Sequence, residues 1–118
     1  MPHRPERLAE MIRDEITELI EGELADPRIG LAAVAEVSLP APGRVAHVRI
    51  QVEGNEDEQR QSLQGLMAAN SFLRAQLGLR LQVRHIPELR FELDRSRQDA
   101  ARIEELLSRA RKRRAKNA

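Results

Sequence analysis

The sequence predicts an α+β fold, in which helices cover one face of a three-stranded sheet and a further helix follows at the C-terminal end. Three observations lead to it. Apolar residues recur at helical spacing near the start of the chain and again near its end. Between these segments, two stretches alternate apolar and polar residues around a proline-rich turn. A third alternating stretch follows a helical region that has a break in its middle.

The first helix is expected at residues 5–24, and its apolar stripe consists of Leu8, Ile12, Ile16, Leu19, Ile20 and Leu24. Asp26 and Pro27 end it, because a residue before proline avoids helical dihedral angles. Strands are expected at residues 31–39 and 44–53, and the Pro-Ala-Pro-Gly turn between them predicts an antiparallel hairpin. In the second strand, the residues expected to point into the core are Ala46, Val48, Ile50 and Val52.

The next helix begins at Asn55, which has the spacing of a capping box with Glu58. Its buried stripe is expected to consist of Leu63, Leu66 and Met67. A break is expected at residues 69–71, because asparagine tolerates the left-handed dihedral angles that end a helix and serine can cap a new one. A short third helix should then carry Phe72, Leu73 and Leu77 and stop at Gly78.

Residues 79–93 alternate in a way that predicts one long strand, interrupted at His85-Ile86-Pro87. Leu79, Leu81 and Val83, followed by Leu89, Phe91 and Leu93, are expected to face the core. The outer face would then carry Arg80, Arg84 and Arg90. Because no acidic residue occurs from Gln59 to Pro87, this cationic face predicts a polyanionic partner.

Charge is distributed unevenly along the 118 residues, although the net charge is only +1. Residues 1–58 contain 13 Asp and Glu against 6 Lys and Arg, whereas residues 59–118 contain 14 basic against 6 acidic residues. This asymmetry is typical of nucleic-acid contact on one side, and ordinary surface variation is the alternative. The chain has no cysteine, a charged start and no long apolar run, which predicts a cytoplasmic protein.

The last helix is expected at residues 96–114, with Ala100, Ile103, Leu107 and Ala110 on one face. We therefore divide the chain into a domain at residues 1–95 and a terminal helix with a basic tail at residues 96–118. The basic residues of the tail are Arg109, Arg111, Lys112, Arg113, Arg114 and Lys116. They exceed what is needed to complement the helix dipole, which favours an electrostatic arm.

Several short motifs, in order, resemble the bacterial ribosome-binding factor A family. They include LADPRIG at residues 24–30, ANSFLR at residues 69–74 and PELRF at residues 87–91. Ser71 stands where the family usually has glycine. The resemblance implies a KH-like type II fold and an assembly factor that binds the small (30S) ribosomal subunit during late maturation. It also implies contact with 16S rRNA, support of 5′-end processing and a role in growth in the cold.

The candidate RNA-binding residues are Asn70, Ser71, Arg74, Arg80, Arg84 and Arg90, together with the six basic residues of the tail. Arginine suits phosphate because its planar fork presents several donors. The alternatives are a solvated sheet face, pairing of Arg90 with Glu88 and Glu92, and helix capping at residues 70 and 71. Arg28 is a weak candidate, because a helix stop with a surface arginine explains it.

No nucleophile–base pair, metal-ligand spacing or nucleotide-binding motif is visible, so we expect no enzyme, no cofactor and no metal. The expected partners are the small ribosomal subunit and its rRNA, bound by a monomer. Two other functions remain open at this stage. One is a protein-interaction domain that docks a basic ribosomal protein through the acidic first helix, and the other is a general KH-like RNA-binding protein.

Overall fold

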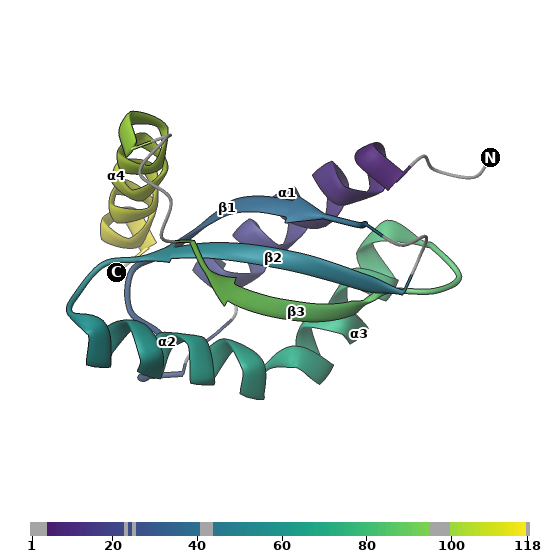
Figure 1. The fold of residues 1–118 in the computed structure, drawn as a ribbon, viewed down its shortest axis with the longest axis horizontal. Coiled ribbons are helices and arrows are strands. Elements are labelled where there is room, and N and C mark those ends of the chain that lie inside the picture. The colour runs from purple at the N-terminus through teal and green to yellow at the C-terminus, as the bar shows by residue number, and fades with distance from the viewer. Residues whose placement is uncertain (1–4, 23, 25, 41–43, 95–99, 118) are drawn as a thin grey trace.

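Helix α1 (Pro5–Gly22) and the hairpin of β1 (Ala32–Ser38) and β2 (Val45–Val52) confirm the predicted start of the fold (Figure 1). The structure is a computed structural model that describes residues 5–22, 24, 26–40, 44–94 and 100–117. Strands β1 and β2 pair antiparallel, and the four predicted inward residues of β2 are buried. No helix in these described ranges is both long and apolar enough to cross a membrane.

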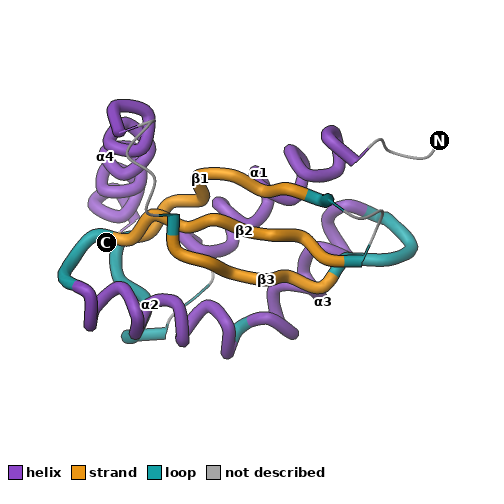
Figure 2. Tube along the Cα trace, in the orientation of Figure 1, coloured by secondary structure: helices purple, strands orange, loops and turns teal. Residues whose placement is uncertain are grey.

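The sheet has the order β1-β2-β3, and β3 (Glu88–Leu93) runs parallel to β2. Helices α1, α2 (Glu56–Ala68) and α3 (Asn70–Leu81) cover one face of it (Figures 1 and 2). Their side chains form one core with the inner face of the sheet, and its fully buried members include Ile12, Ile16, Leu19, Val48, Ile50, Leu66, Leu73 and Leu77. The predicted α+β architecture, with helices backing a three-stranded sheet, is therefore confirmed.

The capping box at the start of α2 is confirmed, and so is the break between α2 and α3. The Asn55 side-chain oxygen accepts a hydrogen bond from the Glu58 backbone amide. The Glu58 carboxylate in turn accepts one from the Asn55 backbone amide. The break lies at Ala69, with φ −86° and ψ 3°. The predicted mechanism was wrong, because Asn70 does not adopt a positive φ and no side chain caps α3. Met67 is also not buried, with 56% of its surface exposed.

The predicted long strand at residues 79–93 is wrong in its first half. Helix α3 continues through Gly78 to Leu81 and ends at Gln82, which adopts the left-handed conformation at φ 54°. A loop then leads to β3 (Figure 2). The physical reason is a helical stripe at four-residue spacing, formed by Leu73, Leu77 and Leu81, all of which are buried. Leu79, expected in the core, is 73% exposed.

Helix α4 (Ala100–Asn117) packs against β1. Leu107, with Leu106 beside it, contacts Ala33 and Ala35 in a small second cluster. A bulge in β1 between Val34 and Glu36 lies at this contact. The expected domain boundary at residues 95 and 96 falls outside the described residues, and so do the side chains of Ala100 and Ile103.

Candidate nucleic-acid interface

The outer face of the sheet carries balanced charge, which corrects the prediction of a cationic face free of acids. Arg49 lies 3.3 Å from Glu36, and His47 lies 3.1 Å from Glu92. The neighbouring pair consists of Arg90 and Glu88, whose charged groups are 3.9 Å apart and largely exposed. Arg49, Arg90 and His47 on this face thus each have a carboxylate nearby, so the face has no excess of positive charge with which to attract phosphate.

Arg80 does not lie on the sheet at all. It occupies α3, and its guanidinium reaches across to α1, where it lies 3.2 Å from Glu15 and 3.4 Å from Glu18. Its side chain retains 30% of its exposure. The residue therefore ties α3 to the acidic face of α1, and an RNA phosphate would have to compete with two carboxylates for it.

At the helix break, the two predicted polar residues have different roles. The Asn70 amide donates a hydrogen bond of 2.6 Å to the Leu89 carbonyl oxygen, which joins the start of α3 to β3. Ser71, one residue further along, is exposed in the first turn of α3. The Asn70 amide is thus used in holding the fold, whereas Ser71 is open to solvent. Their proposed contact with phosphate stays a prediction.

Three exposed arginines belong to, or contact, the segments that lead into β2 and β3, and we call Arg44, Arg74 and Arg84 the basic end. Arg74 is exposed on α3 and donates a hydrogen bond of 3.0 Å to the Ile86 carbonyl oxygen. The Arg44 carbonyl accepts one of 2.9 Å from the Glu88 amide, which places Arg44 beside the same loop. Arg84 is exposed in that loop and forms no ion pair within the described part of the chain.

The basic end includes one residue that is not among the predicted site residues, Arg44. Arg44 stands at the start of a strand that the sequence predicts, and it has no feature that marks it as a site residue. No local pattern distinguishes it, because its position depends on the parallel pairing of β2 with β3. That pairing joins segments that are far apart in sequence, such as Val45 and Glu88.

Most of the basic side chains of α4 pair with carboxylates or backbone carbonyls. Arg113 lies 2.7 Å from Glu21, which retains only 14% exposure. Arg111 pairs with Glu53 and, at 3.1 Å, with Glu104. The expected free basic arm is therefore, in its described part, a helix docked on the body of the protein.

The remaining tail residues behave differently from one another. Arg109 pairs with Glu105 at 2.7 Å within α4, and Arg114 donates a hydrogen bond of 3.3 Å to the Gly30 carbonyl oxygen. Lys112 is exposed and forms no ion pair with a described residue. The side chain of Lys116 lies outside what the structure describes. Among these described tail residues, only Lys112 has no partner of either kind.

The basic end and α4 lie at opposite ends of the sheet (Figure 1). Glu53, which pairs with Arg111 of α4, follows the last residue of β2, whereas Arg44 precedes the first. At about 3.3 Å per residue, the eight residues of β2 span roughly 26 Å. The predicted site residues therefore do not form one site, and a ligand that contacts both regions must be large.

Asp26 and Arg28 form a closed unit in the loop after α1. The Arg28 guanidinium donates to both carboxylate oxygens of Asp26, at 2.6 Å for the shortest contact, and the Arg28 amide donates to Oδ1 at 2.8 Å. These hydrogen bonds lower the pKa of the Asp26 carboxyl group and raise the pKa of the Arg28 guanidinium. A structural role for the pair agrees with the weak case for Arg28 as a ligand contact.

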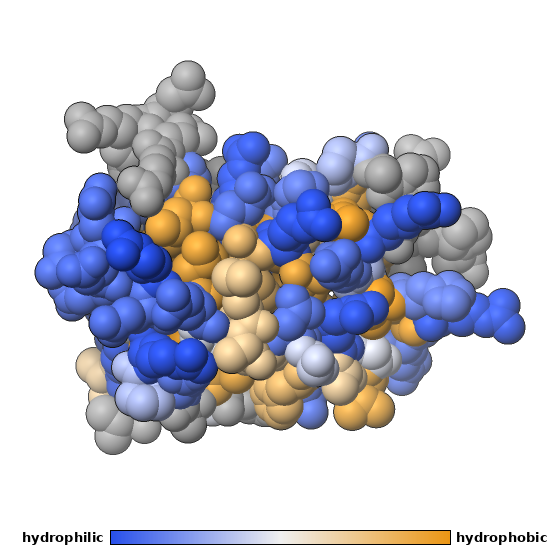
Figure 3. All heavy atoms as spheres, turned by 60° about the horizontal axis from the view of Figure 1, so that its bottom comes forward, coloured by the Kyte–Doolittle hydropathy of each residue, from blue (hydrophilic) through white to orange (hydrophobic). Residues whose placement is uncertain are grey.

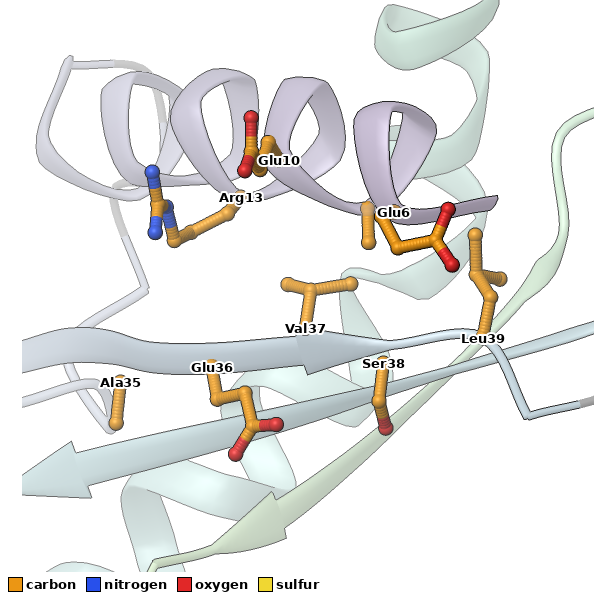
Figure 4. Close-up of a pocket in the computed structure, with 9 residues that line it drawn as sticks. Glu6, Glu10, Arg13, Ala35, Glu36, Val37, Ser38 and Leu39 are labelled. Atoms are coloured by element: carbon orange, nitrogen blue, oxygen red, sulfur yellow. The ribbon is translucent and has the colours of Figure 1, made fainter. Parts of the chain in front are cut away.

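A cleft between α1 and β1 is unsuited to a polyanion (Figure 4). Its lining includes the carboxylates of Glu6, Glu10 and Glu36, with Arg13 as the one cation among its lining residues. Figure 4 shows Val37 pointing from β1 toward α1, whereas Glu36 points to the other side of the strand. Across the described residues, no group of three or more His, Asp or Glu side chains could hold a metal ion.

Comparison with known proteins identifies the family. The family model described as ribosome-binding factor A matches residues 4–107. The chain belongs to this family. A ribosome-binding factor A of Koribacter versatilis is 46% identical over 113 residues, which cover 96% of this chain and 92% of the relative. That of Thermomicrobium roseum is 42% identical over 105 residues, covering 89% and 81%.

Solved structures of ribosome-binding factor A share the fold. The crystal structure of the factor from Thermus thermophilus superposes with a TM-score of 0.68 at 28% identity, covering 76% of this chain and 94% of that chain. A homology model of the Thermus thermophilus factor, fitted into the cryo-EM map of a 30S complex, gives a TM-score of 0.64 at 30% identity and the same coverage. The order of elements is consistent with the predicted KH-like type II fold.

Proposed function

We propose that this protein is an assembly factor that binds the small ribosomal subunit and contacts 16S rRNA during late maturation. Membership of the ribosome-binding factor A family supports the binding of ribosomes, and a homology model of the Thermus thermophilus factor has been fitted into the map of a 30S complex. The factor would act in the cytoplasm as a monomer, without catalysis, and would support 5′-end processing and growth in the cold. The finer steps rest on the resemblance of the motifs to the family.

The basic end is the surface that we propose for rRNA contact. Arg84 carries the argument, because it is exposed and no described carboxylate pairs with it. The Arg74 guanidinium contacts the Ile86 carbonyl of the same loop, and the Arg44 backbone pairs with Glu88 at the end of that loop, so three exposed arginines belong to this end of the sheet. We propose only secondary contacts for Arg80, Arg90 and the arginines of α4. Most of these would have to give up a carboxylate partner for a phosphate, whereas Arg74 gives up only a backbone carbonyl.

Docking of a basic ribosomal protein on the acidic first helix is less favoured. Glu15 and Glu18 of α1 already pair with Arg80, and Glu21 pairs with Arg113. These carboxylates are therefore partly neutralised within the chain. A general KH-like RNA-binding protein remains the other alternative, and it predicts tight binding to short free RNAs.

Co-sedimentation with purified small subunits at two salt concentrations tests the proposal. We expect the double variant Arg44→Gln/Arg84→Gln to bind more weakly and to lower the slope of log affinity against log salt by roughly 1.4–1.8, as two lost phosphate contacts should. The control is Arg60→Gln, which removes one charge of the same kind from an exposed site on α2, and it is compared with each single variant, Arg44→Gln and Arg84→Gln.

Three outcomes would count against it. Equal loss in Arg60→Gln would show that net charge alone decides binding, so the basic end would be wrong. Failure of the unmodified protein to sediment with subunits would refute the function. Equally tight binding to short free RNAs would favour the general RNA-binding alternative.

A further inference from the structure

Helix α4 is held on the body of the protein by little apolar contact. Of its described side chains, residues 104–115, only Leu107 and Ala110 are buried. Leu107 packs on Ala33 and Ala35 in a cluster that is separate from the main core. Hydrophilic side chains cover most of the left end of the molecule in Figure 3, the end at which α4 and the start of α2 lie in Figure 1. Because so little apolar surface is buried, the docking of α4 depends largely on its polar contacts.

The packing between α4 and α1 is also loose. An open cleft of about 550 Å³ lies between α1, β1 and α4, and Thr17, Glu21, Leu106 and Arg113 are among the residues that line it. A gap of this size forfeits dispersion contacts that hold well-packed helices together. It also brings water beside the Glu21 carboxylate, so the departure of α4 would not strand a buried charge.

Arginines near the end of α4 bind carboxylates that belong to the body of the protein. Arg113 lies 2.7 Å from Glu21 at the end of α1, and Arg111 pairs with Glu53, which follows β2. The side chains of Arg113 and Arg111 keep 54% and 41% of their exposure. Both pairs are therefore open to solvent on the arginine side, where they are weakened by salt and where another anion can reach the guanidinium groups.

We propose that docked α4 is autoinhibitory: Glu21 and Glu53 occupy guanidinium groups that would otherwise bind phosphate, and α4 undocks when rRNA phosphates replace the two carboxylates. The inference rests on the proposed function, because rRNA supplies the phosphates. Carboxylate and phosphate accept the same paired hydrogen bonds from arginine, so the exchange substitutes like for like. RNA favours the undocked form because the cations of α4 are free there, and a ligand shifts an equilibrium only through such a difference in affinity.

A permanent strut would explain the two ion pairs but not the other charges of α4. Five of the six residues 109–114 are basic, and only two of them pair with carboxylates of the body in the part of the chain that the structure describes. Lys112, which stands between those two, is exposed and has no ion pair with a described residue. It offers an approaching polyanion a first contact beside both pairs. Short free RNA brings few phosphates and leaves α4 docked, whereas the larger phosphate surface of a subunit displaces it.

Removing the two carboxylates tests the inference. By fluorescence anisotropy, Glu21→Gln/Glu53→Gln should bind a labelled RNA hairpin of mixed sequence about fivefold or more tightly than the unmodified protein, because two cations are released for phosphate. The slope of its log affinity against log salt should steepen by roughly 1.4–1.8, as two gained phosphate contacts require. The matched control is Glu6→Gln/Glu10→Gln, which removes two charges of the same kind from exposed sites on α1 that have no ion pair with a described residue.

Two results of this assay would overturn the inference. If α4 is only a strut, the double variant loses thermal stability and gains no affinity for the hairpin. If Glu6→Gln/Glu10→Gln gains as much affinity as Glu21→Gln/Glu53→Gln, net charge alone decides binding and α4 inhibits nothing.

The distance between two nitroxide labels follows the undocking itself. Because the chain has no cysteine, Ala115→Cys in α4 and Gln64→Cys in α2, both at exposed sites, take one label each. Pulsed electron paramagnetic resonance should give one narrow distance distribution for the free protein and a longer or broader one with purified small subunits. An unchanged distribution in a complex that sediments would overturn the inference and leave the proposed function intact. If the unmodified protein does not sediment with subunits, the proposed function fails, whereas the hairpin assay still decides whether α4 is autoinhibitory.

Discussion

Replacing Gly78 by alanine tests where α3 ends, and with it the position of Arg80 and Arg84. In the structure Gly78 lies inside α3, which continues to Leu81. An added Cβ would meet only Ile86 Cγ1, at 3.8 Å, which is an ordinary contact. Since glycine costs about 0.8–1.0 kcal/mol relative to alanine inside a helix, Gly78→Ala should stabilise the protein by about that amount.

The complementary variant is Gln82→Gly. Gln82 is the one non-glycine residue with positive φ among those described, and a side chain in this conformation costs roughly 1–2 kcal/mol. Glycine removes that cost but increases the freedom of the unfolded chain, so we expect a net gain of about 0.5–1 kcal/mol. For a chain of this size, a change of 1 kcal/mol corresponds to about 4 °C in the unfolding midpoint, which far-UV circular dichroism can resolve.

The opposite result would refute the reasoning. If α3 stopped at Gly78, that glycine would occupy the left-handed position, and alanine there would destabilise the protein by about 1 kcal/mol or more. Gln82→Gly would then weaken a strand instead of relieving a helix end. Arg80 and Arg84 would return to the outer face of the sheet, and the basic end would have to be redefined.

Two further variants test the packing of the loop after α1. Gly65→Ala should destabilise the protein by about 1–2 kcal/mol, because the new Cβ would lie 2.6 Å from Ile29 Cγ1. The control Gly22→Ala should not, because its new Cβ would meet nothing within 4 Å. Equal thermal stabilities of the two variants would contradict this packing. Asp26→Asn should lower the free energy of unfolding most at pH values well above 3.8, because the contact with Arg28 lowers the Asp26 pKa in the folded state. The difference should shrink as the pH falls through and below 3.8, and a difference that grows on acidification would contradict the contact.

The first helix, the hairpin and the capping box could be predicted because each depends on neighbours in sequence. The apolar residues from Ile12 to Leu19 recur only at helical spacing, so they predict a helix and nothing else. The residues of β2 alternate between apolar and polar, which fits a strand and no helix. Around residue 79 two periods coincide. Leu77, Leu79 and Leu81 fit a strand, whereas Leu77 and Leu81 with Leu73 fit a helix, and packing against α1 and the sheet decides between them.

The partners of the arginines could not be read from the sequence. Arg80 and Glu15 are separated by 65 residues, and Arg113 and Glu21 by 92, so their contacts depend on how the helices pack. The excess of basic residues in the second half of the chain is visible in the sequence. Arg80 and Arg113 use part of this charge to hold α3 and α4 against the acidic first helix. That role depends on how the helices pack, which the sequence alone does not show.

Directed hydroxyl-radical probing tests the central claim most directly, which is that the basic end faces rRNA on the small subunit. His85→Cys places an iron chelate in the exposed loop beside Arg84, and Glu10→Cys places it on α1 as the control. With both labelled proteins bound to purified small subunits, we predict cleavage of the 16S rRNA backbone from position 85 and none from position 10. Cleavage from position 10 alone, or from neither position, would contradict the account.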